Sequence, residues 1–162
     1  MKKSTLKQYR HGDVLLERVA KIPARDSLRR VPPENCRVVL AHGEVTGHAH
    51  VFDVADVTKF ESVQGQEFFE VIGRKLEFRL PVVRRWRNQV MVKHPELGLI
   101  EFAVQDVQLR GDDVEVSGKF GLLKHDEHTA QGIPAGLYRG GSAGEQVRQR
   151  EYSLGEARYV QD

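Results

Sequence analysis

Hydrophobic and polar residues alternate along much of the chain with the period of two that is typical of β-strands. The clearest example is the run KLEFRLPVV, in which every second residue from Leu76 to Val82 is apolar and the intervening positions are mostly charged. Pro81 lies in this run, and proline is confined to edge strands or strand ends. No segment keeps a 3.6-residue period, so we expect helix to be a minor component.

Further strands are predicted between turns that contain glycine or proline. They are expected at about residues 12–19, 37–41, 48–54, 89–93, 99–104, 107–109, 114–117, 137–139 and 146–152. The segments RGDD (110–113) and IPAG (133–136) are predicted turns, and GGSAG (140–144) is a predicted flexible loop tip. Residues 22–35 contain three prolines and predict a loop with one helical turn near residues 26–30.

Short strands at regular spacing favour a mainly β fold, either a small barrel or a sandwich. With 162 residues, the chain is long enough to bury a core within one domain. We therefore expect a single domain over residues 1–162. We also expect a β sub-lobe inserted at about residues 60–120, because this region carries a basic stretch and separates the histidine pairs described below.

Composition and charge indicate an ordinary globular protein, with 40% hydrophobic residues, 30% charged residues and a net charge of +2. No apolar stretch approaches the roughly 20 residues of a membrane span, and the basic N-terminus lacks the apolar segment of a secretory signal. The single cysteine, Cys36, fits a reducing compartment and is expected to be a small buried hydrophobe. These features predict a cytoplasmic protein without a membrane partner. The absence of a Walker A loop, GxGxxG and CxxC argues against nucleotide-fold and dithiol chemistry.

Two close histidine pairs carry the candidate chemistry. His48 and His50 lie in HGEVTGHAH, where strand alternation would place both imidazoles on one face. His125 and His128 lie in KHDEH, a spacing that suits a helical turn or a loop. Imidazole is a common ligand of divalent metals. The four histidines therefore predict a site for one divalent ion (Zn, Fe, Mn or Ni) that keeps positions open for water or substrate.

Carboxylates and phenols near these histidines are candidates for supporting roles. The carboxylates would fix an imidazole tautomer or act as a general base, and the phenols would orient a substrate. The residues predicted for these roles are Glu44, Glu127, Tyr138 and Tyr152. His11 and His94 have no neighbouring histidine in the sequence, so we treat them as structural or exposed.

Three functions are consistent with this pattern. The leading hypothesis is a metal-dependent hydrolase, or a metal site that holds a small molecule. The second is a metal-independent ribonuclease or nucleic-acid-binding protein, in which histidines act as acid and base while arginines contact phosphates and an aromatic ring stacks on a base. The residues predicted for the nucleic-acid interface are Arg84, Arg85, Trp86, Arg87, Arg148 and Arg150. The third is a non-catalytic structural β module. The oligomeric state is left open.

Two short segments are similar to motifs of the cupin superfamily. The stretch Gly43 to His50, Gly-x4-His-x-His, resembles the first cupin motif, and IPAG at residues 133–136 resembles the turn of the second. This resemblance implies a double-stranded β-helix that encloses a metal site. The chain departs from the pattern near Asp53, which replaces the expected glutamate, and near Tyr138, where the second motif has a histidine.

The broader pattern resembles a set of short uncharacterised bacterial and phage proteins. These proteins share GDVLL, GEVTGHAH, a His-acidic-acidic-His segment, IPAG-x-Y and QREY. The corresponding segments here are residues 12–16, 43–50, 125–128, 133–138 and 149–152. The resemblance supports the candidate site residues and implies no particular activity.

Overall fold

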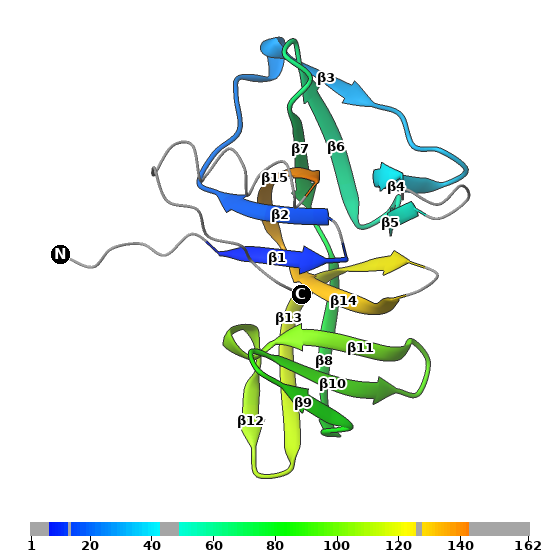
Figure 1. Cartoon of the computed structure of the whole chain (residues 1–162), viewed down its shortest axis with the longest axis vertical. Coiled ribbons are helices and arrows are strands. Elements are labelled where there is room, and N and C mark those ends of the chain that lie inside the picture. Colours follow the sequence, from blue (N-terminus) through cyan, green and yellow to red (C-terminus); the bar gives the residue numbers. More distant parts are fainter. Residues whose placement is uncertain (1–6, 13, 43–48, 126–127, 143–162) are drawn as a thin grey trace, which may run out of the picture.

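The computed structural model describes residues 7–12, 14–42, 49–125 and 128–142, and within these ranges the chain is mainly β. Strands form two sheets, of six and nine strands; most of the nine-stranded sheet lies in the lower half of the view, but its strands at residues 37–42 and 49–53 lie in the upper half with the six-stranded sheet (Figure 1). Two short 3-10 helices, Arg25–Ser27 and Val104–Asp106, connect strands. The mainly β fold expected from the alternation is confirmed. None of the described helices is long and apolar enough to cross a membrane.

The first sheet has six strands in the order β1-β2-β15-β7-β6-β3, and every neighbouring pair is antiparallel. Its strands are β1 (Gln8–His11), β2 (Val14–Val19), β3 (Leu28–Val31), β6 (Val57–Ser62), β7 (Glu67–Val71) and β15 (Gly136–Ser142).

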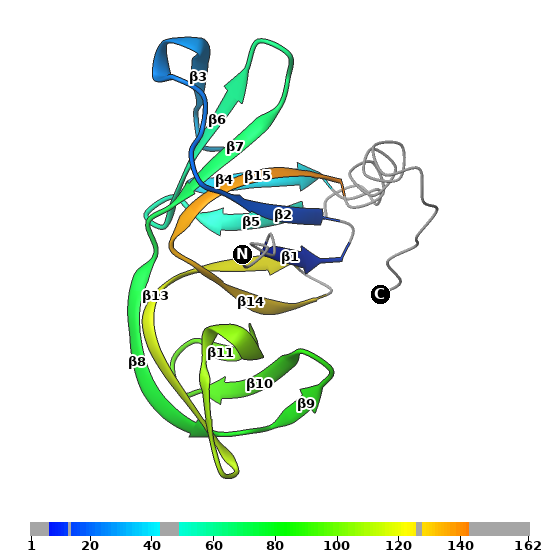
Figure 2. The same cartoon turned by 90° about the vertical axis from the view of Figure 1, so that its left-hand side faces the viewer.

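The second sheet has nine strands, of which seven follow the order β4-β5-β13-β14-β11-β10-β9 while β8 and β12 also pair with β13. Its strands are β4 (Arg37–His42), β5 (Ala49–Asp53), β8 (Arg74–Pro81), β9 (Arg84–Trp86), β10 (Gln89–His94), β11 (Gly98–Ala103), β12 (Gln108–Arg110), β13 (Asp113–His125) and β14 (His128–Pro134). The long strand β13 runs beside β8 and curves with it from the middle of the molecule to its lower end (Figure 2).

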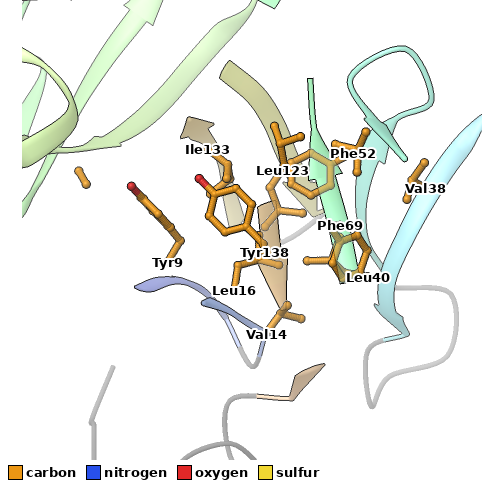
Figure 3. Packing of buried hydrophobic residues seen from close by; sticks show 13 residues of the cluster. Tyr9, Val14, Leu16, Val38, Leu40, Phe52, Phe69, Leu123, Ile133 and Tyr138 are labelled. Atoms are coloured by element: carbon orange, nitrogen blue, oxygen red, sulfur yellow. The ribbon is translucent and has the colours of Figure 1, made fainter. Parts of the chain in front are cut away.

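Buried side chains form two clusters. The first lies between the sheets, as in a β-sandwich, and includes Leu16 and Phe69 from the six-stranded sheet and Phe52 from the other (Figure 3). The second lies within the β8–β13 region. Leu122 belongs to the second cluster and Leu123 to the first. Because neighbouring side chains of a strand point to opposite faces, β13 contributes to both clusters.

Several predicted elements are confirmed at close to their expected bounds. In β8, Leu76 is buried while Lys75 and Glu77 are exposed, and the strand ends at Pro81. The segments 89–93 and 99–104 form the antiparallel pair β10–β11. The RGDD segment is the turn between β12 and β13, with Gly111 at a φ of 62°. The predicted sub-lobe at about residues 60–120 stays a prediction.

Three expectations are wrong. The loop expected over residues 22–35 contains strand β3, which pairs with β6. Residues 140–142 of the expected loop tip belong to β15, where an added Cβ on Gly140 would meet a Phe69 ring carbon, so the glycine allows close packing. Cys36 is exposed, because it lies with Asn35 in a two-residue turn at positive φ (51° and 62°). The strand expected at residues 146–152 lies outside the described residues.

Candidate functional site

Three histidines from distant parts of the chain meet where the two sheets approach each other. His11 ends β1, His50 lies in β5 and His125 ends β13. The rings of His50 and His125 stack with centroids 4.3 Å apart and an interplanar angle of 28°. The ring of His11 meets that of His50 edge-on at 5.0 Å and that of His125 at 6.5 Å. We call these three residues the histidine cluster.

Strand register explains why His50 and His125 are neighbours. The antiparallel pairing of β13 with β5 sets Lys124 opposite Val51. Continuing this register by one residue sets His125 opposite His50, and cross-strand partners share a face of the sheet. The β13–β14 ladder shifts register between Leu123 and His125. Such an irregularity changes the direction of the residues that follow it.

His11 joins the cluster from the other sheet through two hydrogen bonds. Its Nδ1 lies 2.9 Å from Nδ1 of His50, and its Nε2 lies 2.9 Å from the carbonyl oxygen of Thr129 in β14. Both rings are buried, with 5% of His11 and 1% of His50 exposed. Two imidazoles from different sheets are therefore held together away from solvent.

The Thr129 carbonyl fixes the tautomers of this pair. A carbonyl oxygen only accepts hydrogen bonds, so the proton of His11 is on Nε2. For an uncharged pair, the remaining positions follow. Nδ1 of neutral His11 then accepts, Nδ1–H of His50 donates, and Nε2 of His50 carries a lone pair. A nitrogen in this state can ligate a metal or accept a proton.

The structure brings together part of the predicted metal site. His50 and His125 are adjacent, and the backbone of His128 in β14 is the register partner of His125. His48 lies outside the described residues. Among the residues that the structure describes, no group of three or more His, Cys, Asp or Glu side chains is placed to hold a metal ion. The described ligand candidates are therefore an incomplete set, and the metal site stays a prediction.

The predicted supporting residues fall in different places. Tyr138 is fully buried in the first cluster, where its hydroxyl donates to the Pro134 carbonyl at 2.6 Å and its ring meets Tyr9 edge-on. Burial raises the pKa of the Tyr138 phenol above its ordinary value. The other predicted residues lie outside the described ranges: Glu44, Glu127, Tyr152, Arg148 and Arg150.

Sequence analysis overlooked His11 as a member of the cluster. It is separated from His50 by 39 positions, and no short motif links the two residues. The local signal was the turn at Gly12, with a φ of 62°, which reverses the chain between β1 and β2 and leaves His11 at the strand end. The turn predicts where β1 ends, but it does not predict which residues His11 contacts.

The predicted basic interface is far from the histidine cluster. Arg84, Arg85 and Trp86 form β9, the edge strand of the nine-stranded sheet, and all three are exposed, as is Arg87. Strands β10, β11, β14 and β13 lie between β9 and β5. At about 4.8 Å per strand, this separation is about 24 Å along the sheet. The described residues therefore do not unite the arginines of β9 with the histidines.

Comparison with known proteins places the chain in a family. Residues 10–104 match the model of a domain of unknown function, DUF8820, and this match covers more than half of the chain. Neither the curated proteins nor the solved structures gave a significant match. The chain belongs to the DUF8820 family, in agreement with the expected kinship to uncharacterised proteins.

Proposed function

We propose that this member of the DUF8820 family binds one divalent metal ion through His50 and His125, with His128 and His48 as further ligands. When bound, the ion would activate water for hydrolysis or hold a small substrate. The observation that carries the proposal is the stacking of His50 and His125 at 4.3 Å, beside a third histidine.

The spacing of the two rings suits shared coordination. Two imidazole nitrogens on a tetrahedral zinc ion, with Zn–N bonds of about 2.0 Å, lie about 3.3 Å from each other. The ring centroids are 4.3 Å apart, so a rotation of either stacked ring would turn one nitrogen of each toward a common ion. His128, as the strand partner of His125, and His48, two residues before His50, are near enough in the chain to complete the set. A cupin-like arrangement would likewise use His48 and His50 as a pair.

His11 supports the proposal as a positioning residue. Metal-bound histidines almost always donate the second ring N–H to a fixed acceptor, which sets the tautomer and the ring orientation. His50 has such an acceptor in Nδ1 of His11, and His11 is fixed in turn by the Thr129 carbonyl. This chain of hydrogen bonds would make Nε2 the ring nitrogen through which His50 ligates the ion.

Metal content of the untagged protein, measured by inductively coupled plasma mass spectrometry, tests the proposal. We expect about one ion per chain and its loss in His50→Asn and in His125→Ala. The matched control is His94→Asn. His94 is a histidine of β10 whose Nδ1 accepts two turn N–H groups, and the asparagine oxygen can replace that acceptor. Circular dichroism confirms that each variant is folded.

The proposal would be overturned by protein that stays metal-free after incubation with Zn, Mn, Fe and Ni. Metal retained by a folded His125→Ala variant would equally remove His125 from the ligand set. Metal lost from the His94→Asn control would place the binding outside the histidine cluster.

A further inference from the structure

A basic hairpin lies at the free edge of the nine-stranded sheet, independent of the proposed metal site. It consists of β9 and β10, whose register pairs Trp86 with Gln89 across a turn at Arg87 and Asn88. Arg87 has a φ of 54°, in the left-handed region that a tight turn requires. Because strand side chains alternate, Arg84 and Trp86 lie on the same face. We call residues 84–91 the edge hairpin.

The arginines of the edge hairpin are uncompensated within the described part of the chain. No carboxylate there forms an ion pair with Arg84, Arg85 or Arg87. Other described arginines do have carboxylate partners, for example Arg79 with Asp113. Three unpaired guanidinium groups within four residues make a strong local positive field in a chain with a net charge of only +2.

Trp86 adds an exposed aromatic surface to this charge. Its exposure is 59%, and the Arg87 guanidinium lies 5.5 Å from the centre of the indole ring. Trp86 also borders a shallow pocket with Arg84, Gln89 and two further side chains, Met91 and Glu101. An exposed indole presents a flat aromatic face, which is suited to stacking against a flat partner.

The pocket also contains an acceptor without a partner. Oε1 of Gln89 is buried and has no hydrogen-bond partner within the described residues. A buried acceptor left unsatisfied costs free energy, which a ligand that donates a hydrogen bond would recover. The exocyclic amino group of a nucleobase stacked on Trp86 would be such a donor once a rotation of the Gln89 side chain brings this buried oxygen to the pocket surface. The pocket therefore combines a stacking surface, a hydrogen-bond acceptor and adjacent cations.

We propose that the edge hairpin binds single-stranded nucleic acid, with one base stacked on Trp86 and phosphates contacted by Arg84 and Arg87, while Arg85, on the opposite face of β9, adds to the positive field. Exposed base faces distinguish a single strand from a duplex, whose bases are stacked on one another. A polyanion without bases would use the arginines but would leave the indole and Gln89 without partners. Single-stranded nucleic acid uses all of these groups.

The arginine–phosphate contacts predict how steeply the affinity for the nucleic acid should fall as the salt concentration rises. For single strands the logarithm of the affinity falls with the logarithm of the salt concentration by about 0.7 per phosphate contact, so two contacts give a slope of about −1.4. Between 50 and 200 mM salt, the affinity should then fall about 7-fold.

The sole tryptophan gives a direct readout of binding. Full-length protein is titrated with a fluorescein-labelled 20-nucleotide RNA, and anisotropy is recorded together with the intrinsic fluorescence of Trp86. We expect binding with quenching of Trp86. Neutralising Arg84, Arg85 and Arg87 together should weaken binding about 10-fold or more. Trp86→Leu should weaken it about 10-fold while leaving the salt slope nearly unchanged.

The matched control is Lys93→Ala, which removes an exposed cation from the same strand pair at the end away from the turn. Its affinity should equal that of the wild type. A loss in Lys93→Ala as large as in the triple variant would show diffuse charge attraction and overturn the proposal. Equal binding of duplex, or competition by polyglutamate without quenching of Trp86, would overturn it as well. None of these outcomes depends on metal content, so this proposal stands or falls separately from the metal site.

Discussion

Replacing Arg74 by methionine should destabilise the protein strongly, because Arg74 joins three strands through one ionic network. Its Nη2 lies 2.8 Å from Oδ2 of Asp53 and 2.8 Å from Oδ2 of Asp56. Asp53 also lies 3.7 Å from the Lys124 ammonium. The hydrogen bond with Asp56 is the main cause that raises the pKa of the Arg74 guanidinium. The network holds β5, which carries His50, against β8 and β13.

The burial of the two carboxylates determines how much stability each substitution should cost. The Asp56 side chain is 3% exposed and that of Asp53 is 43% exposed. Arg74→Met leaves a buried carboxylate without its cation, a change that costs about 3 kcal/mol when the lost partner is itself partly exposed. Asp53→Asn removes two exposed ion pairs, those with Arg74 and Lys124, and should cost about 0.5 kcal/mol. With a urea m-value of about 2 kcal/mol/M, the midpoints should fall by about 1.5 M and about 0.25 M.

Equilibrium urea unfolding followed by far-ultraviolet circular dichroism measures both shifts. The double variant Arg74→Met with Asp56→Asn should be more stable than Arg74→Met alone, since it leaves no unpaired buried charge. Equal midpoints for Arg74→Met and Asp53→Asn would refute the reasoning. A double variant less stable than Arg74→Met would show that the guanidinium contributes by packing and not by pairing with Asp56.

Three further predictions concern single side chains. Burial raises the pKa of the Asp106 carboxyl above its ordinary value, so its contribution to stability is largest below that ordinary value and is lost as the pH rises through the raised pKa. The melting temperature of wild type minus that of Asp106→Asn should therefore fall from pH 3 to pH 7, and a constant difference would contradict this cause. Gly132→Ala should cost about 2 kcal/mol in urea unfolding, because its Cβ would lie 2.4 Å from Cε1 of Phe102, and an added Phe102→Leu should recover part of the loss. His11→Ala should lower metal affinity about 10- to 100-fold in a chelator competition, since His50 loses its orienting partner, and unchanged affinity would rule out that role.

The alternation of apolar and polar residues was sufficient to predict strands that bury one face and expose the other to solvent. In β8, Leu76 packs in the second cluster while Lys75 and Glu77 face solvent, so the alternation is visible in the sequence. Strand β3 has no such contrast. Its residues LRRV are exposed or half-buried at the edge of the six-stranded sheet, and prolines lie on both sides of it in the sequence. Pairing with β6, and not burial, defines this strand.

The candidate site was predictable only as far as local spacing extends. The two histidine pairs were visible as motifs, and the structure brings His50 and His125 together. The inclusion of His11 depends on the approach of β1 to β14, a contact between residues more than 100 positions apart. Gly140 illustrates the same limit. In the sequence, this glycine indicated a flexible loop. In the structure, it packs against Phe69, and a larger side chain would collide with that ring.

The long strand β13 has a consequence for the order of folding. It pairs with neighbours that come both before and after it in the sequence, from β5 to β14. Non-local pairings of this kind require closure of long loops and form slowly. The meeting of His50 with His125 depends on the pairing of β13 with β5, while the β12–β13 hairpin closes locally. We therefore expect the histidine cluster to form late in folding, after the β12–β13 hairpin.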